Sequence, residues 1–289
     1  MAAHGHEVTV IDVRAPKDTR HRFRHADIRC LPEIVSAMRG AEVVYHLAAE
    51  ANVNQAHADP LSCVALNLQG TANVLETARI DGVSRVVFAS TVWVYNAARG
   101  DTVDEGACLD IGATGHLYTS TKIAGEMMCH NYWQQYQLPF TILRYGIPYG
   151  PGMRDDLVVP IFFRKALAGE PLTINGDGRQ YRKFVYIDDL AEGNCAGLTS
   201  IARNQTYNLE GTEAVTIRQI AEAVGSLVKG VMIEFTPGRP GDFKGRDILA
   251  QKAAEELDWT PRVPFQEGLR RSYEWYLTAH PRFVPASAR

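Results

Sequence analysis

The 289-residue sequence lacks several features that mark special classes of protein. No window reaches about 18 consecutive apolar residues, so no membrane span is predicted. The first 13 residues carry two histidines and two acids and do not resemble a signal peptide. The five cysteines are widely spaced without a CxxC pair, which argues against a disulfide framework or a metal site and predicts a reducing cytoplasm. Because 30 Lys and Arg face 33 Asp and Glu, no basic excess points to nucleic acid.

The sequence does contain an alternation of strand-like and helix-like stretches through its first half. Strands are predicted at residues 7–12, 43–47, 85–89 and 140–144, and helices at residues 60–80 and 118–136. Such alternation predicts a parallel sheet that is covered by helices on both faces. With right-handed crossovers, this is a doubly wound α/β fold of the Rossmann type.

The pattern changes after about residue 150, where Gly and Pro become frequent and the elements shorten. We therefore predict an N-terminal dinucleotide-binding domain over residues 1–150. A smaller C-terminal α/β lobe is expected over residues 151–289, with segments able to return to the sheet. In this lobe a strand is expected at 184–187 and helices at 216–227 and 265–277.

The strongest chemical feature is the pair Tyr118 and Lys122, which a helix would place one turn apart on the same face. A neighbouring ammonium lowers the pKa of a phenol, so the pair suits proton removal from a sugar hydroxyl. An exposed helix pair is the alternative. Thr91 directly follows a predicted strand, so its hydroxyl either points into a ligand crevice beside Tyr118 or caps the strand end.

An acid, Asp12, closes the first predicted strand. In dinucleotide-binding folds an acid at this place binds the adenosine ribose and repels the 2′-phosphate of NADP, which favours NAD. A turn residue is the alternative. Arg14 would favour NADP, but a carboxylate directly at the strand end should dominate. The basic run 14–25 is read as a solvated loop, with an anion contact as the alternative.

These features belong to a larger set of motifs spread over nearly the whole chain. In chain order the set comprises His46-Leu47-Ala48-Ala49, Asn67 with Gly70-Thr71, Ser90-Thr91 before Val94-Tyr95, Tyr118 with Lys122, Leu143-Arg144-Tyr145, Tyr149-Gly150-Pro151, Gly176-Asp177-Gly178, residues 182–189, Arg239-Pro240-Gly241-Asp242 and Leu257-Asp258-Trp259. With these motifs in this order, the chain resembles the extended short-chain dehydrogenases/reductases, specifically the NAD-dependent nucleotide-sugar epimerase/dehydratase family that includes UDP-glucose 4-epimerases.

The resemblance implies NAD as the cofactor and a role for each matching residue. For catalysis it implies Tyr118 as the base, Thr91 as its assistant, and Lys122. For NAD it implies Asp12, Asp27, Ile28, Leu47, Ala48, Ala49, Asn67, Ala89, Ser90, Tyr118, Lys122 and Tyr145. For the nucleotide sugar it implies Thr91, Ile147, Leu157, Ile174, Arg182, Arg239 and Asp242. The two arginines would grip the diphosphate, because guanidinium groups pair well with phosphate oxygens.

Departures from the family pattern narrow the activity. Sugar 4,6-dehydratases carry an Asp-Glu pair after the catalytic Thr, where this chain has Val92-Trp93, so dehydration is not expected. Ile147 stands where epimerases commonly have an Asn that binds the diphosphate, which leaves the identity of the sugar open.

The start of the chain is the largest departure. Residues 2–4 resemble the last turn of a helix with Gly5 as its C′ cap. The family instead begins with a strand, a GxxGxxG turn and a helix whose N-terminus binds the pyrophosphate. We therefore expect a start site about 20 to 25 residues upstream, from the usual size of such an opening. Loss of that central strand should also damage folding.

Together the motifs predict NAD-dependent epimerisation at C4 of a nucleotide sugar, with UDP as the expected nucleotide, through a transient 4-keto intermediate. A nucleotide-uronate decarboxylase or a 4-keto-sugar reductase is the first alternative. A non-catalytic, truncated homologue that binds a nucleotide sugar is the second. The resemblance also implies a homodimer that pairs through the helices at 60–80 and 118–136.

Overall fold

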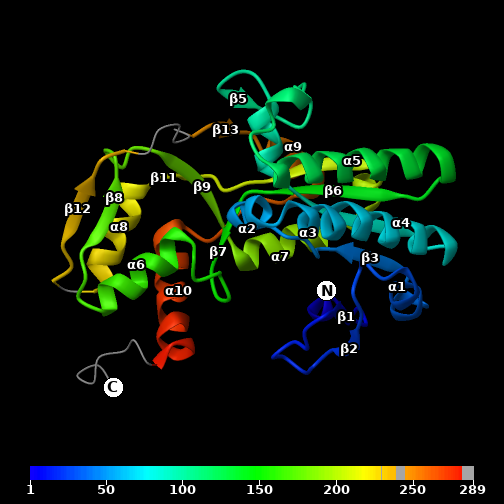
Figure 1. Ribbon diagram of the computed structural model, residues 1–289, viewed down its shortest axis with the longest axis horizontal. Coiled ribbons are helices and arrows are strands. Elements are labelled where there is room, and N and C mark those ends of the chain that lie inside the picture. The colour runs from blue at the N-terminus through cyan, green and yellow to red at the C-terminus, as the bar shows by residue number, and fades with distance from the viewer. Residues whose placement is uncertain (229, 239–244, 282–289) are drawn as a thin grey trace.

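The computed structural model describes residues 1–228, 230–238 and 245–281, which form a larger and a smaller lobe (Figure 1). The main sheet of the larger lobe has four parallel strands in the order β10, β6, β4, β3. Their bounds are β3 (Val43–His46), β4 (Arg85–Thr91), β6 (Phe140–Tyr145) and β10 (Gln205–Leu209). Because β10 pairs with β6, a segment from beyond residue 150 returns to this sheet, while the predicted boundary at residue 150 stays a prediction.

Helices cover both faces of the main sheet. Phe88 and Ile142 point into a core with α1 (Leu31–Met38), α4 (Gly70–Ile80) and α5 (Leu117–Tyr136). Their strand neighbours Val87 and Leu143 point into a second core with α7 (Ile187–Ala196) and α9 (Gln251–Leu257). A parallel sheet buried on both faces explains the nearly continuous apolar runs of the strands. The predicted doubly wound α/β fold is confirmed.

The N-terminal strands form a separate pair. The parallel strands β1 (Thr9–Asp12) and β2 (Arg22–His25) hydrogen-bond to each other. Within the part of the chain that the structure describes, no strand pairing joins them to the edge strand β3. Residues 2–4 form a 3₁₀ turn, η1 (Ala2–His4), which Gly5 ends in the left-handed conformation at φ 84°, as a C′ glycine does.

The long helix predicted at 60–80 is divided. It consists of α3 (Pro60–Val64), the π-helical turn η2 (Ala65–Gln69) and α4, preceded by α2 (Val53–Ala58). A π turn inserts an extra residue and is frequent at functional sites. Asn67 lies in this turn, where its buried amide donates to Thr121 Oγ1 of α5 at 3.0 Å. Apolar periodicity does not reveal the interruption, because apolar spacing tolerates one π turn.

The smaller lobe packs around one apolar core in which Phe163, Leu172, Ile174 and Ile220 are buried. Its sheet has the order β11, β9, β7, from β7 (Ile147–Tyr149), β9 (Tyr181–Tyr186) and β11 (Ala214–Thr216). A parallel pair, β8 (Leu172–Asn175) and β12 (Ile233–Thr236), lies beside it. The helices are α6 (Val158–Leu167), α8 (Ile217–Leu227) and α10 (Phe265–Ala279).

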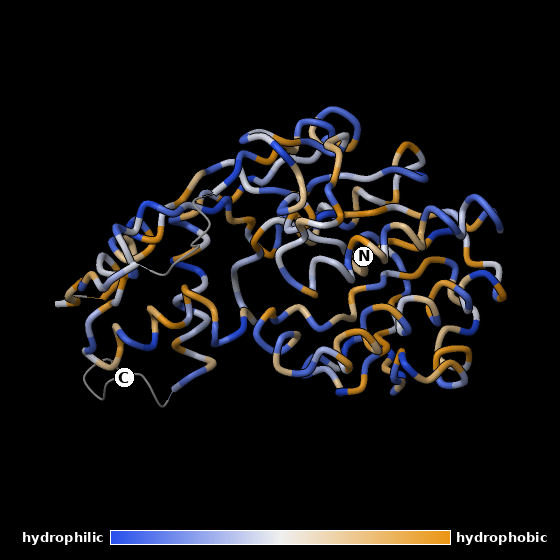
Figure 2. Tube along the Cα trace, turned by 45° about the horizontal axis from the view of Figure 1, so that its top comes forward, coloured by the Kyte–Doolittle hydropathy of each residue, from blue (hydrophilic) through white to orange (hydrophobic). Residues whose placement is uncertain are grey.

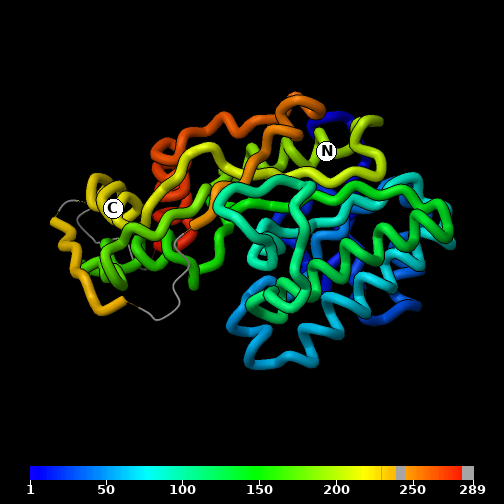
Figure 3. The backbone as a smooth tube through the Cα atoms, turned by 90° about the horizontal axis from the view of Figure 1, so that it is seen from above, coloured from blue at the N-terminus to red at the C-terminus, as the bar shows by residue number. Residues whose placement is uncertain are grey.

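Several short elements lie between the main strands and helices of the larger lobe. After β4 the chain forms η3 (Val92–Ala97), β5 (Thr102–Val103) and η4 (Ile111–Ala113), and β5 pairs with β13 (Asp247–Ile248). The turn η5 (Ser200–Ala202) precedes β10. Figure 3 shows the yellow and orange segments of the second half running back from the smaller lobe along the larger one. Hydrophilic and hydrophobic stretches alternate throughout both lobes (Figure 2), and no described helix has the length and apolar character to cross a membrane.

Candidate active site

Three predicted catalytic residues meet at the carboxyl end of β4. Thr91 is the last residue of this strand, and Tyr118 and Lys122 lie one turn apart on α5. The exposed fractions are 8% for Tyr118 and 5% for Lys122, and Thr91 is also buried. The Thr91 hydroxyl accepts from the Trp93 amide at 3.2 Å and lies close enough to the Tyr118 phenol to lower its pKa. The structure therefore brings together three residues that come from two different elements of the sequence.

The start of α5 is fixed by His116. Its ring nitrogen Nδ1 accepts a hydrogen bond from the Thr119 amide at 3.2 Å, which satisfies one of the free N–H groups at a helix N-terminus. The imidazole stacks on the Tyr118 ring with centroids 6.1 Å apart and meets the edge of Trp93 at 5.5 Å. This aromatic packing fixes where the phenol of Tyr118 lies.

The pKa of Tyr118 differs from the sequence-based prediction, in which the Lys122 ammonium lowers it. Burial raises the pKa of Tyr118 to about 12, although the nearby Thr91 hydroxyl and the charge of Arg154 lower it in part. Burial also lowers the pKa of Lys122 to about 8, against the opposing charge of Glu126. The Lys122 ammonium donates to the Ala89 carbonyl at 2.6 Å and lies 6.0 Å from the centre of the Tyr118 ring. Lys122 does not lower the pKa of Tyr118 here, because it faces the backbone of β4.

An apolar ledge follows the edge strand β3. Leu47, Ala48 and Ala49 come directly after this strand, and 57% of Leu47 is exposed. Behind the ledge, Asn67 exchanges hydrogen bonds with the backbone of Glu50. Exposed apolar residues at the carboxyl end of a parallel strand suit a flat ring system, because ligands of open α/β sheets bind at this edge. The residues present therefore fit a dinucleotide.

Three other predicted cofactor residues, Asp12, Asp27 and Ile28, differ in exposure and in their contacts. Asp12 is exposed, and its Oδ1 accepts from the Arg14 amide at 2.8 Å. Asp27 is paired with Arg29 at 2.6 Å. Ile28 is buried and packs closely against Gly70. A β-carbon on Gly70 would lie only 2.4 Å from the Cδ1 atom of Ile28.

The β4 and β6 residues predicted to contact the cofactor are tied into the protein. Ala89 is buried and accepts the Lys122 bond. Ser90 donates to Glu126 at 2.5 Å, and Tyr145 donates to Asn194 Oδ1 at 2.5 Å. Burial raises the pKa of the Tyr145 phenol. In this arrangement the hydroxyls of Ser90 and Tyr145 are occupied by protein partners.

A small cavity of about 40 Å³ lies beyond Thr91, a predicted catalytic residue. Val92 and Trp93, which follow Thr91, form one wall, and the predicted substrate residues Ile147 and Arg182 form part of another. Arg182 lies on β9 and donates to the Tyr181 carbonyl at 2.6 Å.

The remaining predicted substrate residues lie elsewhere. Leu157 is the half-buried N-cap residue of α6. Ile174 is fully buried in the core of the smaller lobe and does not line the cavity beside Trp93. Arg239 and Asp242 lie outside the described residues.

Two residues near the site were not predicted. Arg154, in the loop after Gly150-Pro151-Gly152, lies close enough to Tyr118 for its charge to lower the phenol pKa. Glu210, directly after β10, is buried in the wall of the small cavity. The position of Glu210 at a strand end was a usable signal. The return of Arg154 to Tyr118 depends on the path of a loop and left no local pattern.

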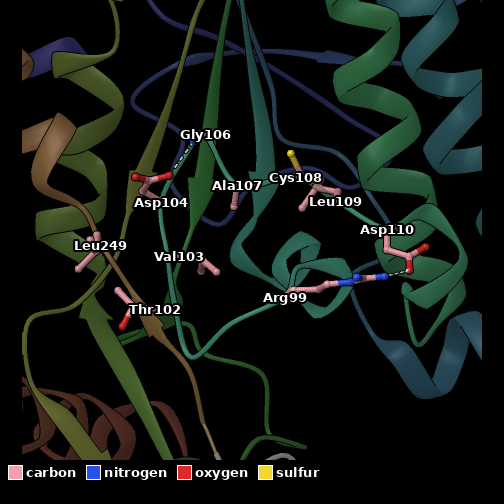
Figure 4. A pocket seen from close by; sticks show the side chains of 10 residues that line it. All are labelled: Arg99, Thr102, Val103, Asp104, Gly106, Ala107, Cys108, Leu109, Asp110 and Leu249. Carbon is pink, nitrogen blue, oxygen red and sulfur yellow. Dashed lines mark hydrogen bonds and ion pairs between the residues drawn. The ribbon is translucent and has the colours of Figure 1, made fainter.

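Two further features lie apart from the predicted site residues. A wider depression of about 610 Å³ lies under the loop 99–110 (Figure 4). Arg99 and Asp110 approach within 4.0 Å across it, and its lining includes none of the predicted site residues. Among the described residues, His4, Glu192 and Cys195 place potential metal-ligating atoms within 4.8 Å of one another, and two of the three are exposed.

The family model and the similar curated proteins agree on one family. The model of the NAD dependent epimerase/dehydratase family matches residues 1–209. A UDP-glucuronate 4-epimerase of Thermodesulfobacterium geofontis is 33% identical over 80% of this chain and 71% of its own. A UDP-N-acetyl-alpha-D-glucosaminuronate decarboxylase of Bacillus cytotoxicus is 29% identical over 96% and 92%.

Solved structures of this fold include bound complexes. The UDP-glucuronic acid 4-epimerase of Bacillus cereus, solved with UDP-glucuronic acid and NAD, superimposes with a TM-score of 0.86 at 28% identity. The match covers 96% of this chain and 93% of that one.

Proposed function

The chain belongs to the NAD dependent epimerase/dehydratase family, and from this premise we propose that it uses NAD to interconvert the C4 epimers of a nucleotide sugar. The resemblance predicted from the motifs is thereby confirmed at the level of the family. One observation carries the finer proposal: Tyr118, beside Thr91 and one turn from Lys122, lies buried near the carboxyl end of β4. Such a phenol can exchange a proton with a sugar hydroxyl.

NAD would be held by the residues along the carboxyl edge. Leu47, Ala48 and Ala49 provide the apolar ledge, and Asp12 offers a carboxylate to the adenosine ribose. When bound, NAD supplies reversible hydride transfer at C4 of the sugar. Lys122 would turn from the Ala89 carbonyl toward the cofactor ribose, and its ammonium would then lower the pKa of Tyr118. Without such help a phenol of pKa about 12 is a poor base at neutral pH.

The chain's own residues then move one proton in each direction. Tyr118 as phenolate takes the proton of the C4 hydroxyl while C4 is oxidised, so that a carbonyl forms at C4. Thr91 orients the same oxygen. After the keto sugar turns over, C4 is reduced from its other face and Tyr118 returns the proton. Oxidation and reduction cancel, so the reaction consumes no cofactor.

Decarboxylation of a nucleotide uronate is the second candidate, because the Bacillus cytotoxicus decarboxylase aligns with 96% of this chain. The same Tyr118 chemistry would begin it, and carbon dioxide would then leave a 4-keto uronate. A 4-keto-sugar reductase would instead consume NADH in proportion to product. The absence of acids at Val92 and Trp93 argues against elimination of water.

The test is a panel of UDP-glucose, UDP-N-acetylglucosamine and UDP-glucuronate, each incubated with the chain and NAD and analysed by chromatography. The proposal predicts a C4 epimer from at least one sugar, without accumulation of NADH. Carbon dioxide with a UDP-pentose would favour the decarboxylase. A separate incubation of a UDP-4-keto sugar with NADH tests the reductase, which would consume NADH in proportion to product. Binding of UDP sugar without NAD binding would identify the non-catalytic alternative.

We also propose that two copies pair through α4 and α5. Exposed apolar residues on these helices, namely Ile80, Met127 and Tyr136, support this arrangement. Light scattering coupled to gel filtration should then give twice the 32.0 kDa of one chain. A mass equal to one chain at micromolar concentration would contradict the pairing.

A further inference from the structure

Glu210 is a buried acid beside the proposed active site. It follows β10 directly, at the carboxyl edge of the main sheet, and 3% of it is exposed. It lines the cavity of about 40 Å³ together with Trp93 and Ile147. On its other side, Trp93 packs in the same apolar cluster as Tyr118. One aromatic side chain therefore links the cavity that Glu210 lines to the proposed base.

Among the residues that the structure describes, only one oxygen of the Glu210 carboxyl group has a hydrogen-bond partner. The amide of Gly211 donates to Oε1 at 3.1 Å, and a β-carbon on Gly146 would lie 2.5 Å from this oxygen. Over the residues that the structure describes, no hydrogen bond reaches Oε2. Oε2 is not among the buried polar atoms that lack a partner in the described part of the chain, so it is open to the cavity, where a hydroxyl or a water can bind it.

The charged groups around Glu210 belong to two segments, β9 and residues 246–247 at the start of β13. From β9, Tyr181, Arg182 and Lys183 line the cavity, and Lys183 is hydrogen-bonded to Asp247 of β13. Arg246 donates to the Tyr95 carbonyl, and Tyr95 lines the same cavity.

Among these influences, burial has the largest effect on the pKa of Glu210. Burial raises the pKa of Glu210 to about 8, with Lys183 lowering it and Asp247 raising it. The carboxyl therefore changes its charge close to neutral pH.

The size of the cavity limits what it can accept. A cavity measured in this way needs about 10–15 Å³ to hold one water molecule, so about 40 Å³ accommodates a small polar group. It fits one polar substituent of a ring whose body lies nearer to Tyr118. A hydroxyl or hydroxymethyl group would fill this space and hydrogen-bond the open oxygen.

We propose that Glu210 determines substrate specificity by hydrogen-bonding a hydroxyl-bearing substituent of the sugar, so that the chain favours uncharged sugars over uronates. This assignment rests on the proposed nucleotide-sugar function. A hydroxyl can donate to the carboxylate or accept from the carboxylic acid, so an uncharged sugar binds at either protonation state. A uronate carboxylate requires Glu210 to keep its proton, because two buried like charges repel.

Calorimetry of UDP-glucose, UDP-glucuronate and UDP at pH 6.5 and pH 9.0 tests the proposal. The wild-type chain should bind UDP-glucose more tightly than UDP-glucuronate. Its preference should grow about tenfold with pH, because the protonated fraction of a group of pKa about 8 falls by that factor. Glu210→Gln should abolish this growth and leave UDP binding unchanged. The matched control Glu234→Gln, exposed on β12, should behave as the wild type.

Three outcomes would overturn the proposal in distinguishable ways. If Glu210→Gln retains the same pH-dependent preference as the wild type, Glu210 does not determine the preference between the two sugars. If the wild type prefers UDP-glucuronate at both pH values, the pocket selects the opposite class. If the wild type binds UDP and neither UDP sugar, the nucleotide-sugar function itself fails, and the assignment that rests on it fails with it. Thermal unfolding at pH 6.5 should show that Glu210→Gln is folded.

Discussion

Replacing Glu126 by Gln should destabilise the chain, because Glu126 is the counter-ion of a buried arginine. Its carboxylate accepts from Arg144 Nη2 at 2.7 Å, from Arg144 Nε at 3.0 Å and from Ser90 at 2.5 Å. Glu126 and Arg144 are both buried. The network joins α5, which carries Tyr118 and Lys122, to the strands β4 and β6.

The expected loss of unfolding free energy follows from the interactions that the Gln amide cannot make with Arg144. Gln keeps one acceptor oxygen, so one Arg144 bond is lost and the guanidinium loses its counter-charge. Breaking a buried ion pair from one side costs about 3–5 kcal/mol. Tyr95 still accepts from Arg144 Nη1 at 2.8 Å, which favours the lower end, about 3 kcal/mol. With a urea m-value of about 3 kcal/mol per molar, the denaturation midpoint should fall by about 1 M.

Urea denaturation followed by tryptophan fluorescence measures this shift. The matched control is Glu267→Gln on α10, where a partly exposed carboxylate pairs with Arg270 and Arg271 at the surface. Surface pairs contribute little, so the control midpoint should stay close to that of the wild type. A Glu126→Gln midpoint within about 0.2 M of the wild type would refute the reasoning, because that shift corresponds to less than 1 kcal/mol.

Three further predictions concern the ionisable residues of the site. Tyr118→Phe should lower turnover by at least about 100-fold while NAD binding by fluorescence titration survives, since it removes only the acid-base group; a wild-type rate would exclude Tyr118 as the base. Lys122→Met should raise the free energy of unfolding at pH 7, because the lowered pKa of Lys122 makes its buried charge unfavourable below about pH 8. This gain should shrink above pH 8, where folded Lys122 loses its proton, and an equal gain at pH 7 and pH 9.5 in urea titrations would contradict that origin. Glu210 has a raised pKa, so the stability it contributes is complete below its unfolded value near 4.5 and is lost as pH rises toward about 8. Glu210→Gln should therefore be more stable than the wild type at pH 8 but not at pH 4.5, and a pH-independent difference would count against the assignment.

The parts of the fold and site that the sequence predicted depend on short-range patterns. The alternating strands and helices follow from apolar periodicity, because both faces of the main sheet are buried. Tyr118 and Lys122 share a face because four residues make about one helical turn. Thr91 reaches Tyr118 because side chains at the carboxyl ends of parallel strands meet at one edge.

Other features depend on contacts between distant segments. The π turn around Asn67 satisfies a bond to α5, which helical spacing does not reveal. Arg154 reaches Tyr118 through the path of a loop. Burial raises the pKa of Tyr118, and the Lys122 ammonium donates to Ala89; neither fact can be read from the spacing of the two residues.

Retention of label at C4 tests the central claim most directly. UDP-glucose and UDP-glucuronate carrying deuterium at C4 are incubated with the chain and NAD, and the products are examined by NMR. The account predicts a C4 epimer that keeps its deuterium at C4, with no deuterium lost to solvent, because the atom removed from C4 returns to the same carbon. Label lost to solvent, label accumulating in reduced NAD, or the absence of any C4 epimer from sugars that bind would contradict it.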